Sequence, residues 1–445
     1  MPTKPQLVFA GTVKPTIEEE RVFDALLEGK RAHEATQHVE LRVVGGWVRD
    51  KLLSQSPGDI DVCLSQMTGQ QFARELGEAF ALVSVNPEQS KHLETAMVRL
   101  AERDVDLTHM RSEEYLAHSR IPRVAVGTPM QDALRRDCTV NALYYNLESR
   151  AVEDPTGMGL RDLQEGVIRT PTTAALTLRD DPLRLLRLIR FAATLGFRLH
   201  EELVEAFSDK QVLEGLRCKI SRERIRTEFD KMMLLHPEGC AAAMHSIEQV
   251  DKLVEIILWQ LQSGTWPPSL VEAVSLPPRV VAAVPSLKVL HATRVAALLL
   301  NADPTELEAL AFPLLKWSNE HARTVLKLIR GSQALRRLPA RPSLRQAGGW
   351  ARQQGPELWE VTLALTAAAE HDWPRFEPLW QELKSGPLSE RAFLPPLLRG
   401  DEIGRARGLR GPSIGAALSD LIEWQMEAPT LSRDAALEHL TSRLY

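Results

Sequence analysis

Asp59, Asp61 and Asp106 have the residue types and the spacing of a metal site. Asp59 and Asp61 flank one isoleucine in an apolar run, and Asp106 belongs to a second such run, residues 105–110. Side chains two residues apart on a β-strand point to the same face, so the first two carboxylates can converge. Mg²⁺ binds carboxylates together with the phosphate oxygens of a substrate. The pattern predicts two Mg²⁺ ions, replaceable by Mn²⁺, that assist in-line phosphoryl transfer.

This carboxylate pattern has alternatives that the spacing leaves open. An isolated Asp-x-Asp pair more often lies in an exposed turn, here SPGDID, with its acids in water. Asp104 competes with Asp106 for the third position, but it lies at the start of the apolar run, where a charge often begins a strand. We therefore expect Asp106 to be the third ligand.

Two adjacent glycines, Gly45 and Gly46, connect an apolar run to a short helical pattern, WVRDKLLS. A dinucleotide-binding turn requires G-x-G-x-x-G and a P-loop requires G-x-x-x-x-G-K-[ST], and the chain has neither after a predicted strand. The amides of a glycine turn, followed by the start of a helix, can instead bind a triphosphate. The glycine pair is therefore predicted to hold the phosphates of a nucleotide.

The carboxylates and the glycines lie on a predicted mixed sheet near the beginning of the chain. Short runs rich in β-branched and apolar residues predict five strands, and two segments between them predict helices. The strands are residues 41–46, 59–64, 81–85, 96–100 and 105–110, and the helices are residues 47–54 and 70–80.

From about residue 165 onward the pattern becomes helical. Apolar positions recur at i, i+3 and i+4, as in residues 180–197 and 220–235, and proline-containing breaks divide the remainder into helical pieces. We predict an α+β fold in which a mixed head precedes an all-α remainder. The predicted parts are a head (1–165), a neck with a base-reading helix (166–235), a body (236–345) and a tail (346–445).

The composition restricts the class of protein. The 445 residues carry a formal net charge of −5, which argues against a uniformly cationic protein that coats nucleic acid. Four widely spaced cysteines form no C-x-x-C pair, so we expect reduced core thiols rather than a zinc knuckle or disulfides. No apolar stretch reaches the roughly 18 to 20 residues that cross a bilayer, and the first residues lack a secretory pattern. We expect an intracellular, cytoplasmic protein without membrane contact; a nuclear or organellar pool is the alternative.

Taken together, the motifs resemble a known family. In chain order they are GGWVRD (45–50), DIDV (59–62), DVDLTHMRSEEY (104–115), RRDCTVN (135–141), DDPLRLLR (180–187) and SRERIRTEF (221–229). The series is similar to the class II tRNA nucleotidyltransferases, the CCA-adding enzymes, in a superfamily with DNA polymerase beta. Two segments, residues 86–96 and 119–147, resemble the eukaryotic-type branch of the tRNA nucleotidyltransferase/poly(A) polymerase family.

This resemblance implies an activity. A member of the family adds C, C and A to the 3′ end of tRNA from CTP and ATP by Mg²⁺-dependent nucleotidyl transfer, without a template, and releases pyrophosphate. The implied fold is a polymerase beta-like nucleotidyltransferase head followed by a helical neck, body and tail, and the tail binds the tRNA backbone. A poly(A) polymerase, a CC-adding enzyme and a tRNA-binding module without catalysis are the alternatives. The oligomeric state is left open.

The resemblance also implies roles for individual residues. Asp181 and Arg184 read the incoming base, Arg187 reaches phosphate, and Asp137 accepts from the ribose 2′-hydroxyl. The residues implied to bind nucleotide are Gly45, Gly46, Arg49, Arg136, Asp137, Asn141, Asp181, Arg184 and Arg187. Those implied to support the site are Asp180, where the family usually has Glu, and Arg224 and Glu228, for which an ordinary i, i+4 ion pair is the alternative. The residues implied to be catalytic and to bind the metals are Asp59, Asp61 and Asp106.

The expected base-reading pair has a physical basis. Helical steps of three keep Asp181, Arg184 and Arg187 near one face of a helix that we expect to begin at Asp180. Cytosine and adenine each present an amino donor beside a ring-nitrogen acceptor, which a carboxylate and a guanidinium satisfy. Guanine and uracil present a carbonyl and an N–H at these positions, so both protein groups would face like partners.

One long connection remains, residues 112–130, which is polar with few periodic apolar positions. It resembles the flexible loop that family members need to add the final adenosine. The alternative is an ordinary long connection, although loops of this length usually have a function.

Overall fold

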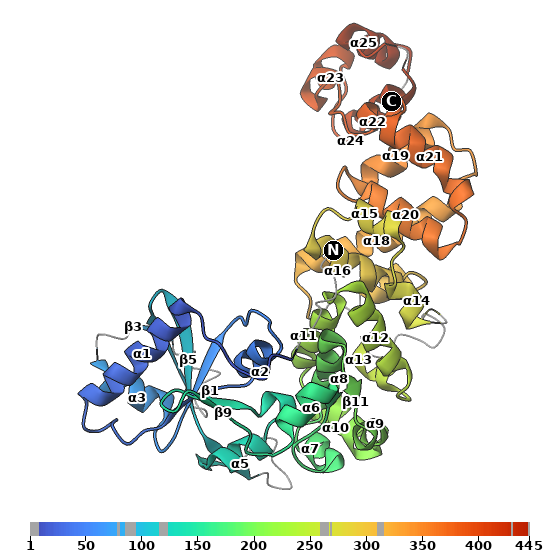
Figure 1. Cartoon of the computed structure of the whole chain (residues 1–445). Coiled ribbons are helices and arrows are strands. Elements are labelled where there is room, and N and C mark those ends of the chain that lie inside the picture. The colour runs from blue at the N-terminus through green and yellow to red at the C-terminus, as the bar shows by residue number, and fades with distance from the viewer. Residues whose placement is uncertain are drawn as a thin grey trace. The chain divides into compact units, whose positions relative to one another are not determined.

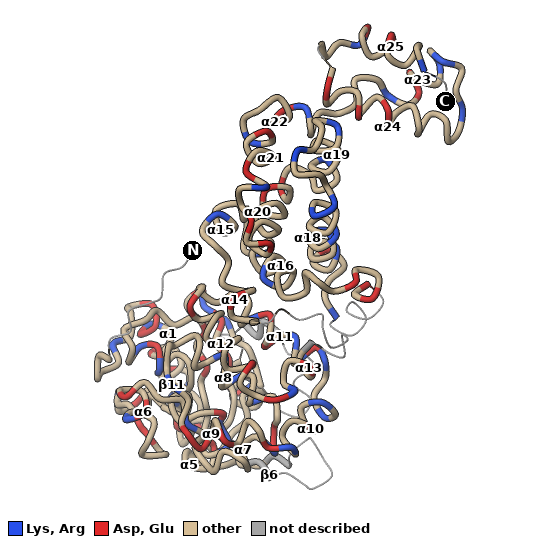
Figure 2. Tube along the Cα trace, turned by 90° about the vertical axis from the view of Figure 1, so that its right-hand side faces the viewer, with Lys and Arg blue, Asp and Glu red and all other residues tan. Residues whose placement is uncertain are grey.

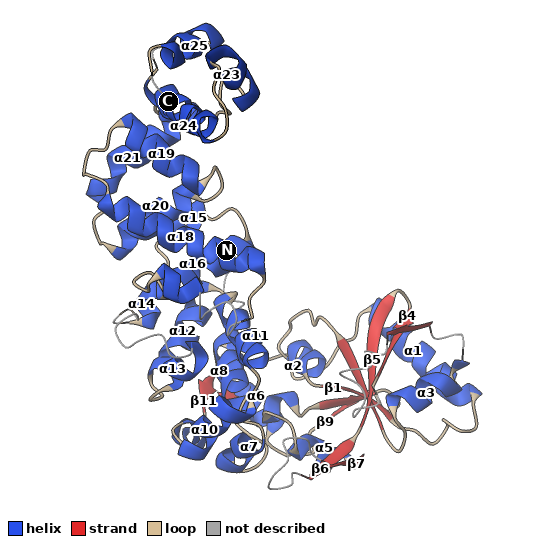
Figure 3. Cartoon of the chain, turned by 180° about the vertical axis from the view of Figure 1, so that it is seen from behind, coloured by secondary structure: helices blue, strands red, loops and turns tan. Residues whose placement is uncertain are grey.

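The chain divides by its internal contacts into two units, residues 1–257 and 258–445. The computed structural model describes residues 9–77, 81–84, 95–114, 123–258, 267, 269–308, 316–428 and 430–443 (Figure 1). Within these residues, all strands belong to the first unit, and the second unit is helical (Figure 3). The predicted α+β class, a mixed head followed by helices, is thereby confirmed. The finer division into head, neck, body and tail stays a prediction.

A seven-stranded mixed sheet forms the centre of the head. Its spatial order is β3-β4-β5-β2-β1-β8-β9, in which β2 and β5 are parallel and all other neighbours are antiparallel. The strands are β1 (Leu41–Val44), β2 (Ile60–Leu64), β3 (Ala81–Ser84), β4 (Ala96–Leu100), β5 (Arg103–His109), β8 (Tyr144–Asn146) and β9 (Ala151–Glu153). The parallel pairing brings the two predicted carboxylate runs side by side.

The structure adds strands that the sequence did not predict. β6 (Arg111–Glu114) pairs with β7 (Arg123–Val126) as an antiparallel hairpin, so the described parts of residues 112–130 are not an irregular loop. Residues 115–122 lie outside the described part of the chain, as does most of the segment 86–96. A two-residue parallel ribbon, β10 (Val167–Ile168) with β11 (Arg198–Leu199), interrupts the region predicted to be a purely helical neck.

The helices of the first unit cover the sheet and continue beyond it. α3 packs on β4 and β5, and the 3-10 turn η2 contacts α2 and α6. The helices are α1 (Ile17–Ala32), α2 (Gly46–Leu52), α3 (Gly69–Glu75), α5 (Pro129–Leu134), η2 (Thr139–Asn141), α6 (Gly159–Glu165), α7 (Ala174–Asp180), α8 (Arg184–Leu195), α9 (Glu201–Phe207), α10 (Lys210–Lys219), α11 (Arg222–Met233), α12 (Pro237–Glu248) and α13 (Leu253–Leu258).

Helix α1 fixes the segment that follows the glycine pair. Its buried Glu19 accepts from Trp47 Nε1 at 2.9 Å and pairs with Lys51 Nζ at 2.6 Å. Phe23 of the same helix meets the Trp47 ring edge-on, with the ring centroids 5.4 Å apart. Since both Trp47 and Lys51 belong to α2, these contacts hold the start of α2 in one position. This role of α1 was not expected from the sequence.

The second unit is a series of helices, and its described residues include two apolar cores. One core gathers around Trp350, Trp359 and Phe376, and the other around Ile403 and Leu421. The helices are α14 (Leu270–Val274), α15 (Pro278–Ala283), α16 (Leu287–Leu298), α18 (Asn319–Arg337), α19 (Leu344–Gln354), α20 (Trp359–Ala369), α21 (Trp373–Ser385), α22 (Leu388–Arg391), α23 (Gly400–Arg407), α24 (Pro412–Glu427) and α25 (Arg433–Thr441).

Two predictions from the composition can be compared with the structure. All four cysteines are described by the structure and none of them forms a disulfide; three are buried, but Cys218 is exposed and is therefore not a core thiol as expected. Over the described residues, none of the helices has both the length and the apolar character needed to cross a membrane.

Candidate active site

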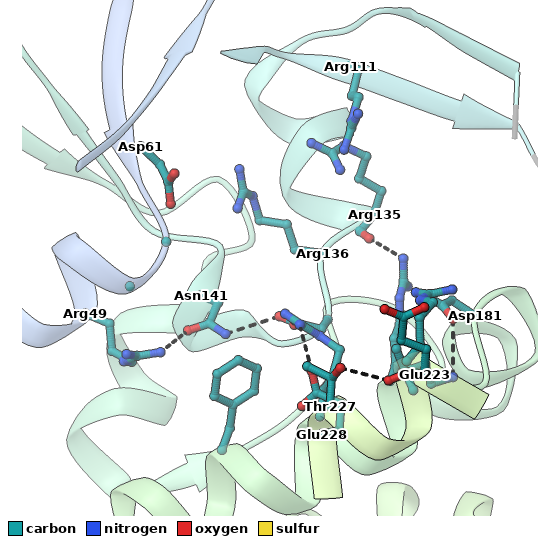
Figure 4. Close-up of a pocket in the computed structure, with 18 residues that line it drawn as sticks. Arg49, Asp61, Arg111, Arg135, Arg136, Asn141, Asp181, Glu223, Thr227 and Glu228 are labelled. Atoms are coloured by element: carbon teal, nitrogen blue, oxygen red, sulfur yellow. Dashed lines mark hydrogen bonds and ion pairs between the residues drawn. The ribbon is translucent and has the colours of Figure 1, made fainter. Parts of the chain in front are cut away.

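A cleft of about 870 Å³ in the first unit brings together all the residues predicted to bind nucleotide (Figure 4). Of the predicted residues, those that line it are Gly45, Gly46, Arg49, Asp61, Arg136, Asp137, Asn141, Asp181, Arg184, Arg187, Arg224 and Glu228. Asp59, Asp106 and Asp180 are not part of its lining. The cleft is rich in arginine, which suits a polyanionic ligand such as a nucleoside triphosphate.

The glycine turn has a backbone conformation that requires glycine. Gly45 has φ 75° and ψ −128°, a region that is essentially restricted to glycine, and its amide donates to the Leu143 carbonyl at 3.2 Å. A Cβ atom built on Gly45 would lie 3.7 Å from the Arg136 guanidinium. The turn therefore lets the main chain pass close to a cationic group that faces the cleft.

Replacement of Gly45 by alanine tests this turn. We expect Gly45→Ala to destabilise the protein by about 1 to 3 kcal/mol, because the backbone conformation is strained for a residue with a Cβ. Affinity for CTP should fall as well, since the turn would move relative to Arg136. Thermal unfolding and calorimetric titration with CTP measure the two effects. Gly415→Ala is the control, because Gly415 has open space around it and an ordinary φ; equal effects in both variants would contradict the assignment.

Two of the predicted carboxylates face each other across the parallel strands. Asp61 on β2 and Asp106 on β5 are direct partners in the register, and Asp59 precedes β2 by one residue. Asp104 instead forms a two-point ion pair with Arg99 of β4, at 2.7 and 2.9 Å, on the exposed surface. The geometry therefore favours Asp106 over Asp104 as the partner of Asp61.

Burial and neighbouring carboxylates raise the pKa of both Asp61 and Asp106. Burial is the largest cause that raises the pKa of Asp61 to about 6, and the negative charges of Asp106 and Asp59 add to it, opposed by Arg136. The pKa of Asp106 is raised by burial and by Asp59. Such mutual repulsion is relieved by a bound cation, so the donor set fits a divalent metal.

Protein side chains alone do not complete a metal site. Within the described part of the chain, no group of three or more His, Cys, Asp or Glu side chains is arranged to hold a metal ion by itself. Mg²⁺ commonly takes one or two carboxylates and completes its shell with substrate phosphates and water. Asp61 and Asp106 with the phosphates of a nucleotide correspond to that arrangement.

The raised pKa of Asp61 predicts a pH dependence of metal affinity. A proton competes with the metal for this carboxylate, so Mn²⁺ affinity should fall as the pH drops below about 6. Because one pKa unit equals about 1.4 kcal/mol, we expect a loss of up to about tenfold per pH unit below that point. Titration of Mn²⁺ followed by electron paramagnetic resonance measures the affinity. Affinity that stays constant down to about pH 4.5 would exclude Asp61 as a ligand.

Asp137 of the RRDCTVN segment is held from two sides. Its carboxylate accepts from Arg187 Nε and Nη2 at 2.9 and 2.6 Å, and from Asn141 Nδ2 at 3.2 Å. Burial alone would raise the pKa of Asp137, but Arg187 and Asn141 lower it to about 2. Asp137 is therefore an ionised acceptor at neutral pH, and Arg187 lies against it in this structure.

A chain of hydrogen bonds continues from Asp137 to the helix after the glycine pair. Asn141 Oδ1 accepts from Arg49 Nη1 at 2.6 Å, and the Arg49 guanidinium lies 5.7 Å from the centroid of the Phe191 ring. Asn141 thus connects Arg49 to Asp137 along one wall of the cleft. Its neighbour Cys138 is fully buried, which raises the pKa of its thiol well above the ordinary value, so it remains protonated.

The predicted base-reading helix begins later than the sequence suggested. Asp180 is the last residue of α7, Asp181 is extended, and α8 begins only at Arg184. The reason is local, because the Asp181 carboxylate accepts from the Leu183 amide at 3.2 Å and its carbonyl accepts from the Arg184 amide at 3.0 Å. The expectation of one helix from Asp180 was wrong, but Asp181, Arg184 and Arg187 still line one cleft.

Neighbouring elements hold this base-reading pair. Arg224 Nη2 of α11 donates to Asp181 Oδ2 at 3.2 Å, and Arg184 Nη2 donates to the main-chain oxygen of Arg135 at 2.7 Å. The buried Glu228 accepts from Arg190 Nε of α8 at 2.6 Å. Arg224 and Glu228 therefore each reach across to another element, in contrast to the simple i, i+4 pair that was the alternative.

Several residues of the site were not singled out from the sequence. The fully buried Asp132 accepts hydrogen bonds from Arg135 and Arg136, and the buried Asp162 accepts from Thr139 Oγ1 at 2.7 Å. Further cleft residues that were not singled out are Arg111, Arg135, Leu183, Phe191, Glu223 and Thr227. A buried acid within a short helical pattern gives no periodic signal, so the sequence alone does not identify it.

Comparison with known proteins places this cleft in context. Residues 41–169 match the family described as the poly A polymerase head domain. The tRNA nucleotidyltransferase cca1 of Schizosaccharomyces pombe is 32% identical over 89% of this chain and 89% of its own length. The mitochondrial CCA tRNA nucleotidyltransferase of Saccharomyces cerevisiae is 45% identical, but the match spans 47% of this chain and only 41% of that protein.

Solved structures share the fold. The CCA-adding enzyme of Bacillus stearothermophilus in complex with CTP superimposes with a TM-score of 0.71 over 96% of this chain and 98% of that one. The sequence identity is 19%, so this likeness concerns the fold.

Proposed function

Because the chain belongs to the family of tRNA nucleotidyltransferases, we propose that it adds C, C and A in turn to the 3′ end of tRNA from CTP and ATP. The reaction is nucleotidyl transfer without a template: the tRNA 3′-hydroxyl attacks the α-phosphate in line and pyrophosphate leaves. The observation that carries the proposal is one cleft that combines the carboxylate of Asp61 with the pair Asp181 and Arg184.

Membership of a nucleotidyltransferase family indicates dependence on a divalent metal. We propose two Mg²⁺ ions, replaceable by Mn²⁺, that Asp59, Asp61 and Asp106 hold together with phosphate oxygens of the nucleotide. The bound metal activates the attacking hydroxyl and neutralises charge that develops on the leaving group. The raised pKa of Asp61 supports a site that a cation completes.

Residues of the head orient the nucleotide in this proposal. The Gly46 amide and the Arg136 guanidinium bind the triphosphate, and Gly45, whose own amide donates to the Leu143 carbonyl, forms the turn that lets the phosphates approach. Asp137, ionised at neutral pH, accepts from the ribose 2′-hydroxyl and so favours ribonucleotides. Arg187 holds Asp137 in place and contacts phosphate.

Asp181 and Arg184 select the base. Asp181 accepts from the exocyclic amino group of cytosine or adenine, and Arg184 donates to the adjacent ring nitrogen. Uracil and guanine would leave both groups opposite like partners, at a cost of several kcal/mol. Support comes from the hydrogen bonds that fix the Asp181 carboxylate in the cleft, because Oδ2 accepts from Arg224 and Oδ1 accepts from the Leu183 amide.

The second unit is proposed to bind the tRNA backbone. Arg323, Lys327 and Arg330 are exposed at helical spacing on one face of α18, and further arginines lie on α23 and beside it (Figure 2). Contacts to phosphates make affinity fall steeply with salt concentration.

A charge-removal variant tests this surface. We expect the double variant Arg323→Ala/Lys327→Ala to weaken tRNA binding and to reduce the slope of log K against log salt by about 1 to 2, because each lost phosphate contact removes about 0.7 to 0.9 from the slope. Filter binding between about 50 and about 200 mM KCl measures the slope. Lys384→Ala is the control, since Lys384 already pairs with Glu360 at 2.8 Å. An unchanged slope in the double variant would remove this face from the binding surface.

The activity itself is tested with tRNA that lacks its CCA end. The protein is incubated with CTP alone, with ATP alone and with both, and the products are separated by length. We expect two added C residues with CTP alone, and a third residue, A, only when both nucleotides are present. Long A tails would indicate a poly(A) polymerase, arrest after two C residues with both nucleotides would indicate a CC-adding enzyme, and no extension would indicate a binding module.

Regarding location, we infer a cytoplasmic protein with an organellar pool. The inference of an organellar pool rests on the Saccharomyces cerevisiae relative, which is named as a mitochondrial protein. Cell fractionation followed by immunoblotting tests the inference.

A further inference from the structure

Asp132 on α5 carries a carboxylate that is completely buried and fully hydrogen-bonded. Its Oδ1 atom accepts from Arg135 Nε at 2.9 Å and from the Arg111 amide at 3.2 Å. Its Oδ2 atom accepts from Arg136 Nη2 at 2.9 Å and from Tyr144 Oη at 2.7 Å. Four groups from three segments therefore meet at one side chain, whose exposed fraction is 0%.

The ionised form of this carboxylate is strongly favoured. Burial alone would raise the pKa of Asp132, but the charges of Arg136 and Arg135 and the Tyr144 hydroxyl hold it well below the ordinary value. One negative charge thus faces two guanidinium groups, and both arginines also line the cleft. The surplus positive charge is left on the side of the cleft, where an anionic ligand can meet it.

Each arginine leads to a different end of the cleft. Arg136 lies at the glycine-turn end of the cleft, because a Cβ atom built on Gly45 would lie 3.7 Å from its guanidinium, and Figure 4 shows it next to Asp61. Arg135 lies beside the base-reading pair, because its main-chain oxygen accepts from Arg184 Nη2 at 2.7 Å. The two arginines are consecutive in sequence, so a single anchor can fix both ends at once.

We propose that Asp132 is a positioning residue that sets the spacing between the phosphate-binding and base-reading ends of the nucleotide cleft. It holds Arg136 directly at the first end, and through Arg135 it holds Arg184 at the second. The inference rests on the proposed function, because the two ends are defined by a bound nucleotide. Tyr144 shares the role to a smaller degree, since its hydroxyl donates to Asp132 and its ring lies 5.5 Å from the Arg136 guanidinium carbon.

A simply structural role for Asp132 makes a different prediction. Any buried ion pair stabilises its surroundings only as long as both partners remain, so its loss lowers the melting temperature. Such a loss reduces the amount of folded protein but leaves KM and base choice of the folded fraction unchanged. A positioning role changes both of these quantities.

The test uses Asp132→Asn, Tyr144→Phe and the control Glu153→Gln, each as the full chain. In Asp132→Asn an amide N–H replaces one acceptor and faces a guanidinium donor, so the arginines are displaced. Glu153 pairs with the buried Arg42 at 2.6 Å on the same sheet but does not line the cleft. All are assayed well below their melting temperatures, for kcat and KM with CTP and ATP and for misincorporation of UTP.

We expect Asp132→Asn to raise KM for both nucleotides by about tenfold or more and to increase the UTP to CTP incorporation ratio by a similar factor. Tyr144→Phe should change both in the same direction by a smaller factor, and Glu153→Gln should change neither. If Asp132→Asn and Tyr144→Phe both keep the KM and the base selectivity of the unchanged protein, Asp132 is only structural and the inference is wrong. If Asp132→Asn does not fold, Tyr144→Phe decides by the same criteria.

The unchanged protein separates this inference from the proposed function. Calorimetric titration with CTP and extension of tRNA lacking CCA are carried out on it first. If the unchanged protein neither binds CTP nor extends the tRNA, the proposed function is wrong. If it does both, but the variants have the same KM and base selectivity as the unchanged protein, only the role of Asp132 is wrong.

Discussion

Asp61→Asn is expected to abolish nucleotide addition and, at the same time, to stabilise the metal-free protein. The variant removes a proposed metal ligand, so turnover with CTP and with ATP should fall by at least about a thousandfold. It also removes a buried negative charge beside Asp106. Burial and the negative charge of Asp106 raise the pKa of Asp61 to about 6. A neutral side chain of the same shape avoids this cost.

The sign of the stability effect follows from the direction of the pKa shift. The pKa of the folded protein lies above the ordinary value of 3.8, so the folded protein binds this proton more tightly than the unfolded chain. Stability of the metal-free protein is therefore lost as the pH rises from 3.8 to about 6, and the loss is complete above that range. We expect a gain of about 1 to 3 kcal/mol for Asp61→Asn at neutral pH, and a smaller gain as the pH falls toward 4.

Thermal unfolding in the presence of a chelator, at neutral and acidic pH, measures the stability effect. Filter binding should show that the variant still binds tRNA, because the contacts proposed for the tRNA backbone lie in the second unit. Asp104→Asn is the matched control: Asp104 is exposed and pairs with Arg99, so its loss should leave turnover nearly unchanged. Normal turnover in Asp61→Asn would remove the metal assignment.

Asp181→Ala is expected to have the second largest effect, on base choice. The variant loses the acceptor for the amino group of the incoming base and also the partner of Arg224. Use of CTP and ATP should fall by about 100-fold, as expected for a lost hydrogen bond to a charged group together with a displaced neighbour. Discrimination against UTP and GTP should fall with it, because Asp181 no longer repels their carbonyl groups.

Steady-state kinetics with each of the four nucleotides in turn measure these ratios. Arg224→Ala should give an intermediate loss, because it keeps the carboxylate but removes its support. Glu201→Gln removes an exposed charge on α9 and serves as the control. Unchanged ratios in Asp181→Ala would show that base selection resides elsewhere.

The part of the structure that follows from local signals could be predicted. The strand at residues 96–100 was predicted with its observed bounds, and the register of β2 with β5 explains why Asp106 rather than Asp104 faces Asp61. Alternation along strands and turn residues between them carry this information within a few neighbouring residues. The turn at Gly45 and Gly46 was predicted for a similar reason, because adjacent glycines lie between a strand pattern and a helix pattern. Its role in binding phosphate stays a prediction.

The break at Asp181 could not be predicted from periodicity. Apolar residues recur at helical spacing across this segment, but Pro182 disfavours helical backbone at Asp181, and the Leu183 amide donates to the Asp181 carboxylate, so the helix is interrupted there. A side chain that competes for a backbone amide produces such a break without altering the apolar pattern.

Contacts between distant segments were also beyond the sequence. Asp132 resembles an exposed acid on a short helix, and it is buried only because Tyr144 and the Arg111 main chain close over it. In the same way, the pairing of Arg187 with Asp137 joins residues that are 50 positions apart. Such partners are chosen by tertiary packing, which a single sequence does not report.

In the proposed activity, one cleft selects C and then A without a template strand. It is tested most directly by sequencing the 3′ ends of tRNA lacking CCA after incubation with all four nucleotides at equal concentration and Mg²⁺. We expect the 3′ ends to carry C, C and A in this order, followed by arrest. Ends that carry U or G at a frequency similar to that of C, or uninterrupted runs of A, would contradict it.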